Sequence, residues 1–518
     1  VASNSITPAA AQTITFATPG AQNFGTTPTL TATSDSGLTP TFTSSTTSVC
    51  TITSGGLLSF VTAGSCTINA DQAGNGSYLP ATQVTRTFTV NAVARINGSS
   101  VTANTQDYKK NVVLGGAGTA KSLVANTLTL ASGTTITATG FDVALHVNTL
   151  NLNTATSVGG GALTLVQRTG TGSIGVDTSA TETLNLTTAN LTALGSFSSL
   201  TIGEAGSTTT VEFGSAYTLT RDTTLVGDTS VTLLGITGAS HDLTLTSASS
   251  VFNGAVAGVA ELTTSGATAV NANISASTLI DFGGLTTLAS GAAGVTRTLD
   301  AATVNLTGLA GGNKNIAIKA DTLVLNGTSA DYSGANATLA THTNGRDISL
   351  ETTAATTDLE VDAVTRGKLS SFSQLTIGRS DSNSAISATT AVTLTTNTTL
   401  ISGTGTMSLA GITGGGFALT LTGSGDTTLS GAFTNLDSLT SNGNGRTIIT
   451  TDLTTTTSMN FAAGENVVFD GAASAISLRS ASIALSGNLD ADGKSVTFRA
   501  DSLTLTGSIS NAQLANSS

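Results

Sequence analysis

Residues 315–327 have the sequence NIAIKADTLVLNG, and the spacing of apolar side chains in this stretch decides the fold. Ile316, Ile318 and Ala320 lie two residues apart, so they share one face of an extended strand. After the Ala-Asp step, the apolar set shifts by one residue to Leu323 and Leu325. A strand that stops, turns and restarts with opposite parity is expected where a chain bends around the corner of a solenoid.

The same corner pattern recurs at residues 496–507, VTFRADSLTLTG, where Val496, Phe498 and Ala500 precede Leu503 and Leu505. Short L-x-L segments also fill the chain from about residue 93 onward, separated by Gly, Ser, Thr, Asn and Asp. Alternation predicts that the aliphatic pairs point inward and the threonines outward. The clearest pairs are Leu128/Leu130, Leu150/Leu152, Leu163/Leu165, Leu184/Leu186, Val231/Leu233, Leu243/Leu245, Leu323/Leu325, Leu419/Leu421 and Leu503/Leu505.

A long internal repeat is superimposed on these strands. SFSSLTIG begins at Ser196 and SFSQLTIG at Ser371, 175 residues later. ADTLVLNG at Ala320 and ADSLTLTG at Ala500 are 180 residues apart. We therefore expect a duplication of 175–180 residues with small insertions in the turns. At roughly 20–25 residues per coil, residues 93–518 predict roughly 17–20 coils of a parallel β-helix. An array of β-sandwiches is the main alternative, but the short loops and the absence of a period near ~90 residues disfavour it.

Composition supports a thin, regular interior. The 518 residues are too many for one ordinary core, only 4% are aromatic and none is Trp, so aliphatic side chains must fill the interior. The 58 glycines and many threonines favour strands and turns over helices, and the chain has no long run of helix-forming residues. The net charge of −12 argues against nucleic acid or an anionic membrane surface as a partner. No apolar run reaches the roughly 18 residues of a membrane span.

Residues 1–92 differ from the rest, because all five prolines fall there and six or seven short strands are predicted. This density of strands indicates a small β-sandwich. The segments SVCTI, AGSCTI and AGNGSYLPA make residues 11–92 similar to the bacterial immunoglobulin-like modules of large surface proteins. Cys50 and Cys66 have nearly identical surroundings and predict a disulfide between adjacent strands, which implies an oxidising compartment. Two buried free thiols in a cytosolic protein are the alternative.

Residues 182–207 and 357–382 carry the second resemblance, through the sequences TANLTALGSFSSLTIG and AVTRGKLSSFSQLTIG. They resemble coils of the filamentous-haemagglutinin-like large exoproteins of Gram-negative bacteria. The resemblance implies a right-handed β-helix, export from the cell, and adhesion or extracellular assembly. The N-terminal secretion domain of that family is not evident in the chain. We also expect no initiator Met, signal peptide or C-terminal anchor among these residues. We expect a processed protein or an excerpt of a longer one.

Titratable groups are scattered, so no catalytic residue and no cofactor are predicted. His146, His241 and His342 are interpreted as surface residues. Asp358, Glu360 and Asp362 have period-two spacing, which would place three carboxylates on one strand face and suit an inverting glycosidase or a weakly bound Ca²⁺. The equivalent residues of the other repeat are uncharged, so a solvated acidic stripe is the favoured interpretation.

Two recurring surface patterns remain. Lys319/Asp321 and Arg499/Asp501 are interpreted as corner ion pairs of a coil. Outward T-x-T pairs would suit an ice-binding or polysaccharide-binding face, although simple β-propensity explains them as well. The T-x-T pairs are Thr218/Thr220, Thr244/Thr246, Thr393/Thr395 and Thr420/Thr422.

These observations predict an all-β protein, with an immunoglobulin-like sandwich in residues 1–92 and a right-handed parallel β-helix in residues 93–518. The predicted role is a non-catalytic structural or adhesive rod at a bacterial cell surface or outside the cell, in a Gram-negative organism. The expected partners are further copies of the chain, joined end to end, and a glycan or host-surface receptor. The alternative is a β-helix protein that binds or degrades polysaccharide, since such enzymes share this architecture.

Overall fold

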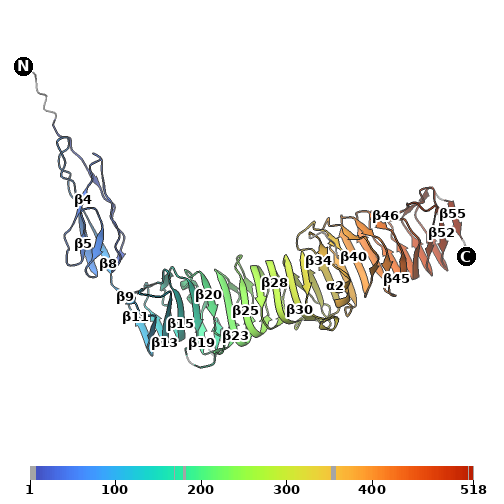
Figure 1. Ribbon diagram of the computed structural model, residues 1–518, viewed down its shortest axis with the longest axis horizontal. Helices are drawn as coiled ribbons and strands as arrows, with labels where there is room; N and C mark the ends of the chain where they lie inside the picture. The colour runs from blue at the N-terminus through green and yellow to red at the C-terminus, as the bar shows by residue number, and fades with distance from the viewer. Residues whose placement is uncertain (1–7, 169, 179–181, 352–356, 511–512, 517–518) are drawn as a thin grey trace, which may run out of the picture. The chain divides into compact units, whose positions relative to one another are not determined.

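The computed structural model describes residues 8–168, 170–178, 182–351, 357–510 and 513–516 (Figure 1). It is 54% strand and 3% helix, which confirms the all-β prediction. Two compact units divide the chain: residues 1–168 with 189–198, and residues 169–188 with 199–518. Parallel β-solenoid turns occur in both units, about 20 in all. The predicted division between residues 92 and 93 stays a prediction, although the pattern of strand pairing changes there.

Up to Asn91 most strand pairs are antiparallel, and β2, β8, β7 and β4 form one four-stranded sheet. Two smaller sheets pair β1 with β3 and β5 with β6. The interior between them is apolar and includes Phe16, Phe42 and Phe88. The strands are β1 (Ile14–Thr15), β2 (Gln22–Asn23), β3 (Thr33–Ser34), β4 (Thr41–Ser44), β5 (Cys50–Ile52), β6 (Leu58–Phe60), β7 (Gly64–Asp71) and β8 (Val84–Asn91).

The predicted disulfide is present and joins Cys50 to Cys66, with their Cα atoms 5.8 Å apart. Cys50 begins β5, which pairs with β6, whereas Cys66 lies in β7 of the four-stranded sheet. The bridge therefore links two sheets, and the expectation of two adjacent strands was wrong. Short strands with few neighbours make a small core, and a covalent link across it compensates for that.

From Val93 onward every ladder in the described part of the chain is parallel. In the first unit, β9, β12, β14 and β16 form one face, and β10, β11, β13, β15 and β17 form another. The strands are β9 (Val93–Ile96), β10 (Ser100–Thr102), β11 (Thr105–Tyr108), β12 (Asn111–Leu114), β13 (Ala120–Leu130), β14 (Thr135–Thr137), β15 (Asp142–Asn151), β16 (Thr156–Val158) and β17 (Ala162–Val166).

The second unit continues this parallel pairing through two sheets. One of them contains β35 (Ile348–Ser349), β36 (Leu359–Glu360), β38 (Ile386–Ala388), β41 (Met407–Leu409), β44 (Thr427–Leu429), β46 (Arg446–Ile449), β48 (Asn466–Phe469), β51 (Asn488–Asp490) and β54 (Ile509–Ser510). The other contains β18 (Gly172–Val176), β19 (Leu184–Leu186), β20 (Ser199–Ile202), β21 (Thr208–Phe213), β22 (Tyr217–Thr218), β23 (Asp222–Leu233), β24 (Ile236–Thr237), β25 (Leu243–Phe252), β26 (Val256–Thr264), β27 (Ala267–Val270), β28 (Ile274–Thr287), β29 (Thr296–Asp300), β30 (Thr303–Ala310), β31 (Asn315–Lys319), β32 (Thr322–Leu325), β33 (Tyr332–Ser333), β34 (Asn336–Ala340), β37 (Gln374–Gly378), β39 (Val392–Thr393), β40 (Asn397–Gly403), β42 (Ile412–Thr413), β43 (Leu419–Gly423), β45 (Phe433–Ser441), β47 (Leu453–Phe461), β49 (Ala475–Arg479), β50 (Ser482–Leu485), β52 (Ser495–Arg499), β53 (Ser502–Leu505) and β55 (Gln513–Asn516).

Aliphatic side chains form continuous buried rows from coil to coil. In the first repeat, Leu243, Leu262, Ile280 and Val304 stack in register and are at most 1% exposed. The equivalent row of the second repeat is Leu419, Leu439, Met459 and Ile483. These rows confirm the inward prediction for the L-x-L segments. Leu323, Leu503 and Leu505 are only partly buried.

The predicted corner near Ala320 is confirmed. β31 ends at Lys319 and β32 begins at Thr322, with the buried Ala320 and Asp321 between them. The backbone N–H groups of Asp321 and Thr322 both donate to the carbonyl of Ala302 on the preceding coil, each at 2.9 Å. The bend therefore keeps its backbone hydrogen bonds while the inward parity changes.

Among the described residues, two short helices interrupt the strands: α1 (Thr188–Ala193) and α2 (Ala363–Lys368). A 3-10 turn, η1 (Ser329–Asp331), is also present. α1 and α2 begin 175 residues apart, so they are one feature of the duplicated sequence. Each holds one buried residue, Leu191 in α1 and Arg366 in α2. Tertiary packing outweighs weak intrinsic propensity in helices this short.

Candidate functional site

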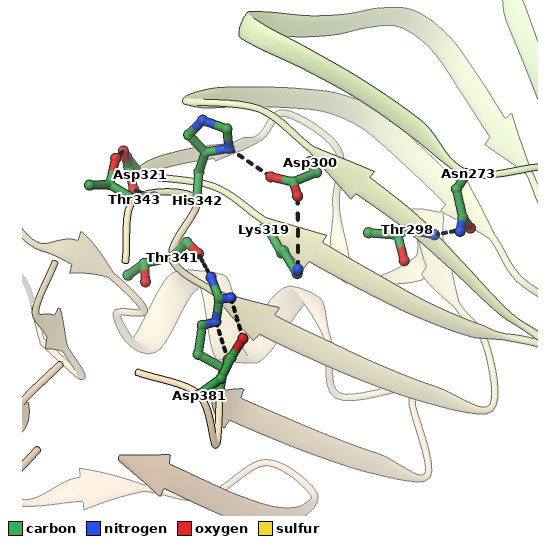
Figure 2. A network of polar contacts seen from close by, with 10 residues as sticks. Asn273, Thr298, Asp300, Lys319, Asp321, Thr341, His342, Thr343 and Asp381 are labelled. Carbon is green, nitrogen blue, oxygen red and sulfur yellow. Dashed lines mark hydrogen bonds and ion pairs between the residues drawn. The ribbon is translucent and has the colours of Figure 1, made fainter. Parts of the chain in front are cut away.

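A cluster of charged side chains lies where the coils of the first repeat meet the start of the second (Figure 2). Asp300 ends β29 and Lys319 ends β31, and the two residues are in register on successive coils. The carboxylate of Asp300 lies 2.6 Å from His342 Nδ1 through Oδ1 and 3.9 Å from Lys319 Nζ through Oδ2. Asp300 thus has a partner for each of its oxygens.

A second carboxylate of the cluster is held more tightly. Asp321 is 8% exposed, and it accepts hydrogen bonds from the backbone N–H of Thr343 at 2.9 Å and from its hydroxyl at 2.5 Å. Arg346 Nη1 lies 4.0 Å away. Because Asp321 and Thr343 belong to successive coils, these contacts clamp one corner to the next.

A third acidic group, Asp381, forms a bidentate pair with Arg379, at 2.6 Å through Nε and 2.7 Å through Nη2. These hydrogen bonds lower the pKa of Asp381 to about 2. Arg379 also donates to the backbone carbonyl of Thr341 at 3.3 Å, which connects this pair to the rest of the cluster in Figure 2.

The cluster is charge-compensated. Catalysis by a His–Asp pair needs a nucleophile or a substrate within hydrogen-bonding reach of the other ring nitrogen. The structure gives no such contact to His342 within the residues it describes. Partly exposed ion pairs of this kind contribute about 0–1 kcal/mol each. Several contacts of the cluster join side chains and backbone groups of successive coils.

The three carboxylates singled out by spacing do not share a strand face. β36 contains only Leu359 and Glu360, Asp358 precedes it in a bend, and Asp362 is the N-cap of α2. The Asp362 side chain accepts a hydrogen bond from the backbone N–H of Thr365 at 2.8 Å. Across the described part of the chain, no group of three or more His, Cys, Asp or Glu residues is placed to hold a metal ion.

The three histidines lie apart and are all half-buried. His146 faces outward in β15, between the buried Leu145 and Val147. His241 Nδ1 lies 3.4 Å from Asp222 Oδ1. The contact between His342 and Asp300 was missed by sequence reasoning. The residues are 42 positions apart, and only the stacking of coils brings them together.

Threonines form outward ladders in both repeats. Thr201, Thr224, Thr244 and Thr263 are in register on four successive coils, and each is half-buried. Thr376, Thr399, Thr420 and Thr440 form the equivalent ladder. With strands about 4.8 Å apart, each ladder presents a regular line of neutral hydroxyl groups. The eight threonines of the predicted T-x-T pairs are likewise exposed or half-buried.

None of the helices described is long and apolar enough to cross a membrane. No protein-family model, no curated protein and no solved structure matches this chain.

Proposed function

We propose that this protein is a non-catalytic, extracellular structural or adhesive protein that uses its β-solenoid as a stiff scaffold. The observation that carries the proposal is the regularity of the coils. Buried aliphatic rows and outward threonine ladders recur in both repeats, at equivalent residues. Stacked coils give stiffness without chemistry, and each coil contacts mainly its neighbours.

A lack of catalysis is supported by how the charged residues are used. Asp300 and Asp321 bind groups of neighbouring coils, and Asp381 pairs with Arg379 two residues before it. Asp362 caps a helix instead of facing a substrate. We therefore assign these carboxylates to stability.

An extracellular location, at or beyond a bacterial cell surface, is supported by the disulfide between Cys50 and Cys66, because such bonds persist in oxidising compartments. The sheets and apolar interior of residues 10–91 are consistent with an immunoglobulin-like module. The parallel coils are consistent with a right-handed β-helix like those of filamentous-haemagglutinin-like exoproteins. Those resemblances also suggest a Gram-negative source.

Self-association end to end is the proposed mode of assembly, because parallel coils stack on one another through the same backbone hydrogen bonds along the solenoid. Negative-stain electron microscopy of the purified protein tests the proposal. Regular polymers would support a filament, and stiff isolated particles would support a stalk or adhesin. Compact globular particles would contradict both forms.

Polysaccharide binding is a second candidate, favoured by the two threonine ladders, whose hydroxyls could meet the hydroxyls of a sugar chain. A polysaccharide-degrading activity is tested by assaying acidic polysaccharides with the wild type and with Asp358→Asn and Glu360→Gln variants. We expect no turnover by any of the three proteins. Turnover that both substitutions abolish would replace the structural proposal with an enzymatic one.

A further inference from the structure

A groove of about 620 Å³ lies at a corner of the second repeat. Residues from three successive coils line it: 454–456, 479–481 and 499–501. Thr454, Arg479 and Arg499 are in register, so the two guanidinium-bearing side chains project from neighbouring coils about 4.8 Å apart. Both arginines are exposed.

Neither arginine has a carboxylate within 4.0 Å among the residues that the structure describes, although Asp501 is part of the lining. Like charges directly opposite on neighbouring strands destabilise a sheet. The chain has 18 basic and 30 acidic residues, so this pair of positive charges stands out in a chain where carboxylates outnumber cations.

The first repeat supplies the comparison. Its equivalent corner aligns Ser275, Asp300 and Lys319 in register. There a carboxylate stands opposite the cation, and Asp300 lies 3.9 Å from Lys319. The second repeat has Arg479 at the position of Asp300, so the internal anion is replaced by a second cation.

We propose that this corner, the arginine groove, binds the carboxylates of an acidic glycan such as a polyuronate. Guanidinium groups bind carboxylates through paired hydrogen bonds, and two guanidiniums one coil apart suit successive charges along an extended ligand. The ligand carboxylate supplies the negative charge that Asp300 supplies to Lys319 in the first repeat.

The rest of the lining favours a sugar over a peptide or a lipid. It consists of Thr454, Thr455, Thr456, Ser480, Ala481, Ala500 and Asp501 in addition to the arginines. Among these lining residues, no aromatic side chain and no aliphatic side chain larger than Ala is available to anchor an apolar group. The hydroxyls of Thr455 and Ser480 are buried and hydrogen-bonded to each other. The exposed hydroxyls of Thr454 and Thr456 and the carboxylate of Asp501 instead match the hydrogen-bonding hydroxyls of a glycan.

Isothermal titration calorimetry with the full chain tests the inference, with an oligogalacturonate as ligand and its methyl ester as the uncharged counterpart. We expect the acid form to bind, with affinity that falls as salt increases, and the ester to bind at least tenfold more weakly. Equal binding of the two forms, or no binding of the acid form, would overturn the proposal. Binding of poly-glutamate but not of oligogalacturonate would also overturn it, in favour of a protein partner.

The decisive variant is Arg479→Asp, which recreates the ion pair of the first repeat and so leaves folding intact. It should weaken oligogalacturonate binding at least tenfold, and Arg499→Ala should do the same. Lys494→Ala, which removes one positive charge outside the groove lining, immediately before β52, should stay within twofold of the wild type. Unchanged affinity in Arg479→Asp would refute the inference.

The inference deepens the adhesive part of the proposed function and depends on it. The two fail in different ways. Arg479→Asp leaves the particles seen by electron microscopy unchanged, so loss of glycan binding with intact particles supports the groove. If the wild type forms stiff particles but does not bind oligogalacturonate, the arginine-groove proposal is refuted and the scaffold proposal stands.

Discussion

The ring of Phe372 lies directly against the backbone of Gly334 on the preceding coil, and a Cβ on residue 334 would overlap the ring. Phe197 covers Gly160 in the same way in the other copy of the sequence. Phe372 is 2% exposed and Phe197 3%, so neither ring has room to move away. Each pair lies beside one of the two short helices and joins the segment after the helix to the coil beneath.

Gly334→Ala should therefore destabilise the protein by about 1–3 kcal/mol, because overpacking a closed site forces neighbouring groups to shift. Equilibrium urea denaturation followed by circular dichroism measures the effect. Gly367→Ala is the matched control. Residue 367 lies in α2, where an added Cβ would meet nothing within 4 Å, and Ala there should stabilise by roughly 0.5–1 kcal/mol. If Gly334→Ala is as costly in a Phe372→Ala background as in the wild type, the ring is not the cause.

Leu262→Ala should cost about 2–5 kcal/mol, because Leu262 is fully buried in the aliphatic row between Leu243 and Ile280. Thr263→Ala is its control. Thr263 is the next residue, points outward in the threonine ladder, and should change stability by about 0.5 kcal/mol or less. Urea denaturation midpoints compare the two variants. If both substitutions reduced stability equally, the assignment of Leu262 to the inward face and Thr263 to the outward face would be wrong.

Replacing both cysteines by serine should destabilise the N-terminal strands by about 3 kcal/mol, because the bridge closes a loop of 16 residues in the unfolded chain. The effect should be confined to the unfolding transition of residues 10–91, monitored by hydrogen exchange. The slow hydrogen-exchange rates of β25 and β26 should be the same in the Cys50→Ser/Cys66→Ser variant and in the wild type. A loss of protection throughout the solenoid would contradict this local role.

The pH dependence of stability should contain a contribution from Glu351. Burial raises the pKa of Glu351, but hydrogen bonds from Thr389 and Thr390 outweigh it and lower the pKa from 4.5 to about 2. The folded state binds this proton less readily than the unfolded state, so the contribution is fully present above pH 4.5 and is lost as pH falls toward 2. Urea midpoints of the wild type and Glu351→Gln should differ at about pH 6 and converge near pH 2. A constant difference across this range would exclude the carboxylate as its source.

Much of the solenoid was predictable from particular residues. The parity change between Ile318 and Leu323 indicated a corner, and the alternation of Leu and Thr indicated the buried and exposed faces. Both arise from the two-residue period of a strand, which is a local property of the chain. The pairing of Cys50 with Cys66 was also predictable, since the chain has no other cysteine.

Other features were not local. The helix at Ala363–Lys368 has little intrinsic propensity and is held by burial of Arg366 and by the Asp362 cap. The same cap removed Asp362 from the predicted acidic strand face. Coil length decides that His342 contacts Asp300 and that Arg479 lies opposite Arg499. The sequence reveals that length only approximately.

The amino-acid sequence by itself determined that the chain forms stacked strands, where those strands turn, and that a duplicated unit builds them. Tertiary structure alone decided which side chains meet across coils. The reason is physical. Alternation along a strand is set by bonds between adjacent residues, whereas the neighbour on the next coil depends on the exact number of residues in each intervening turn.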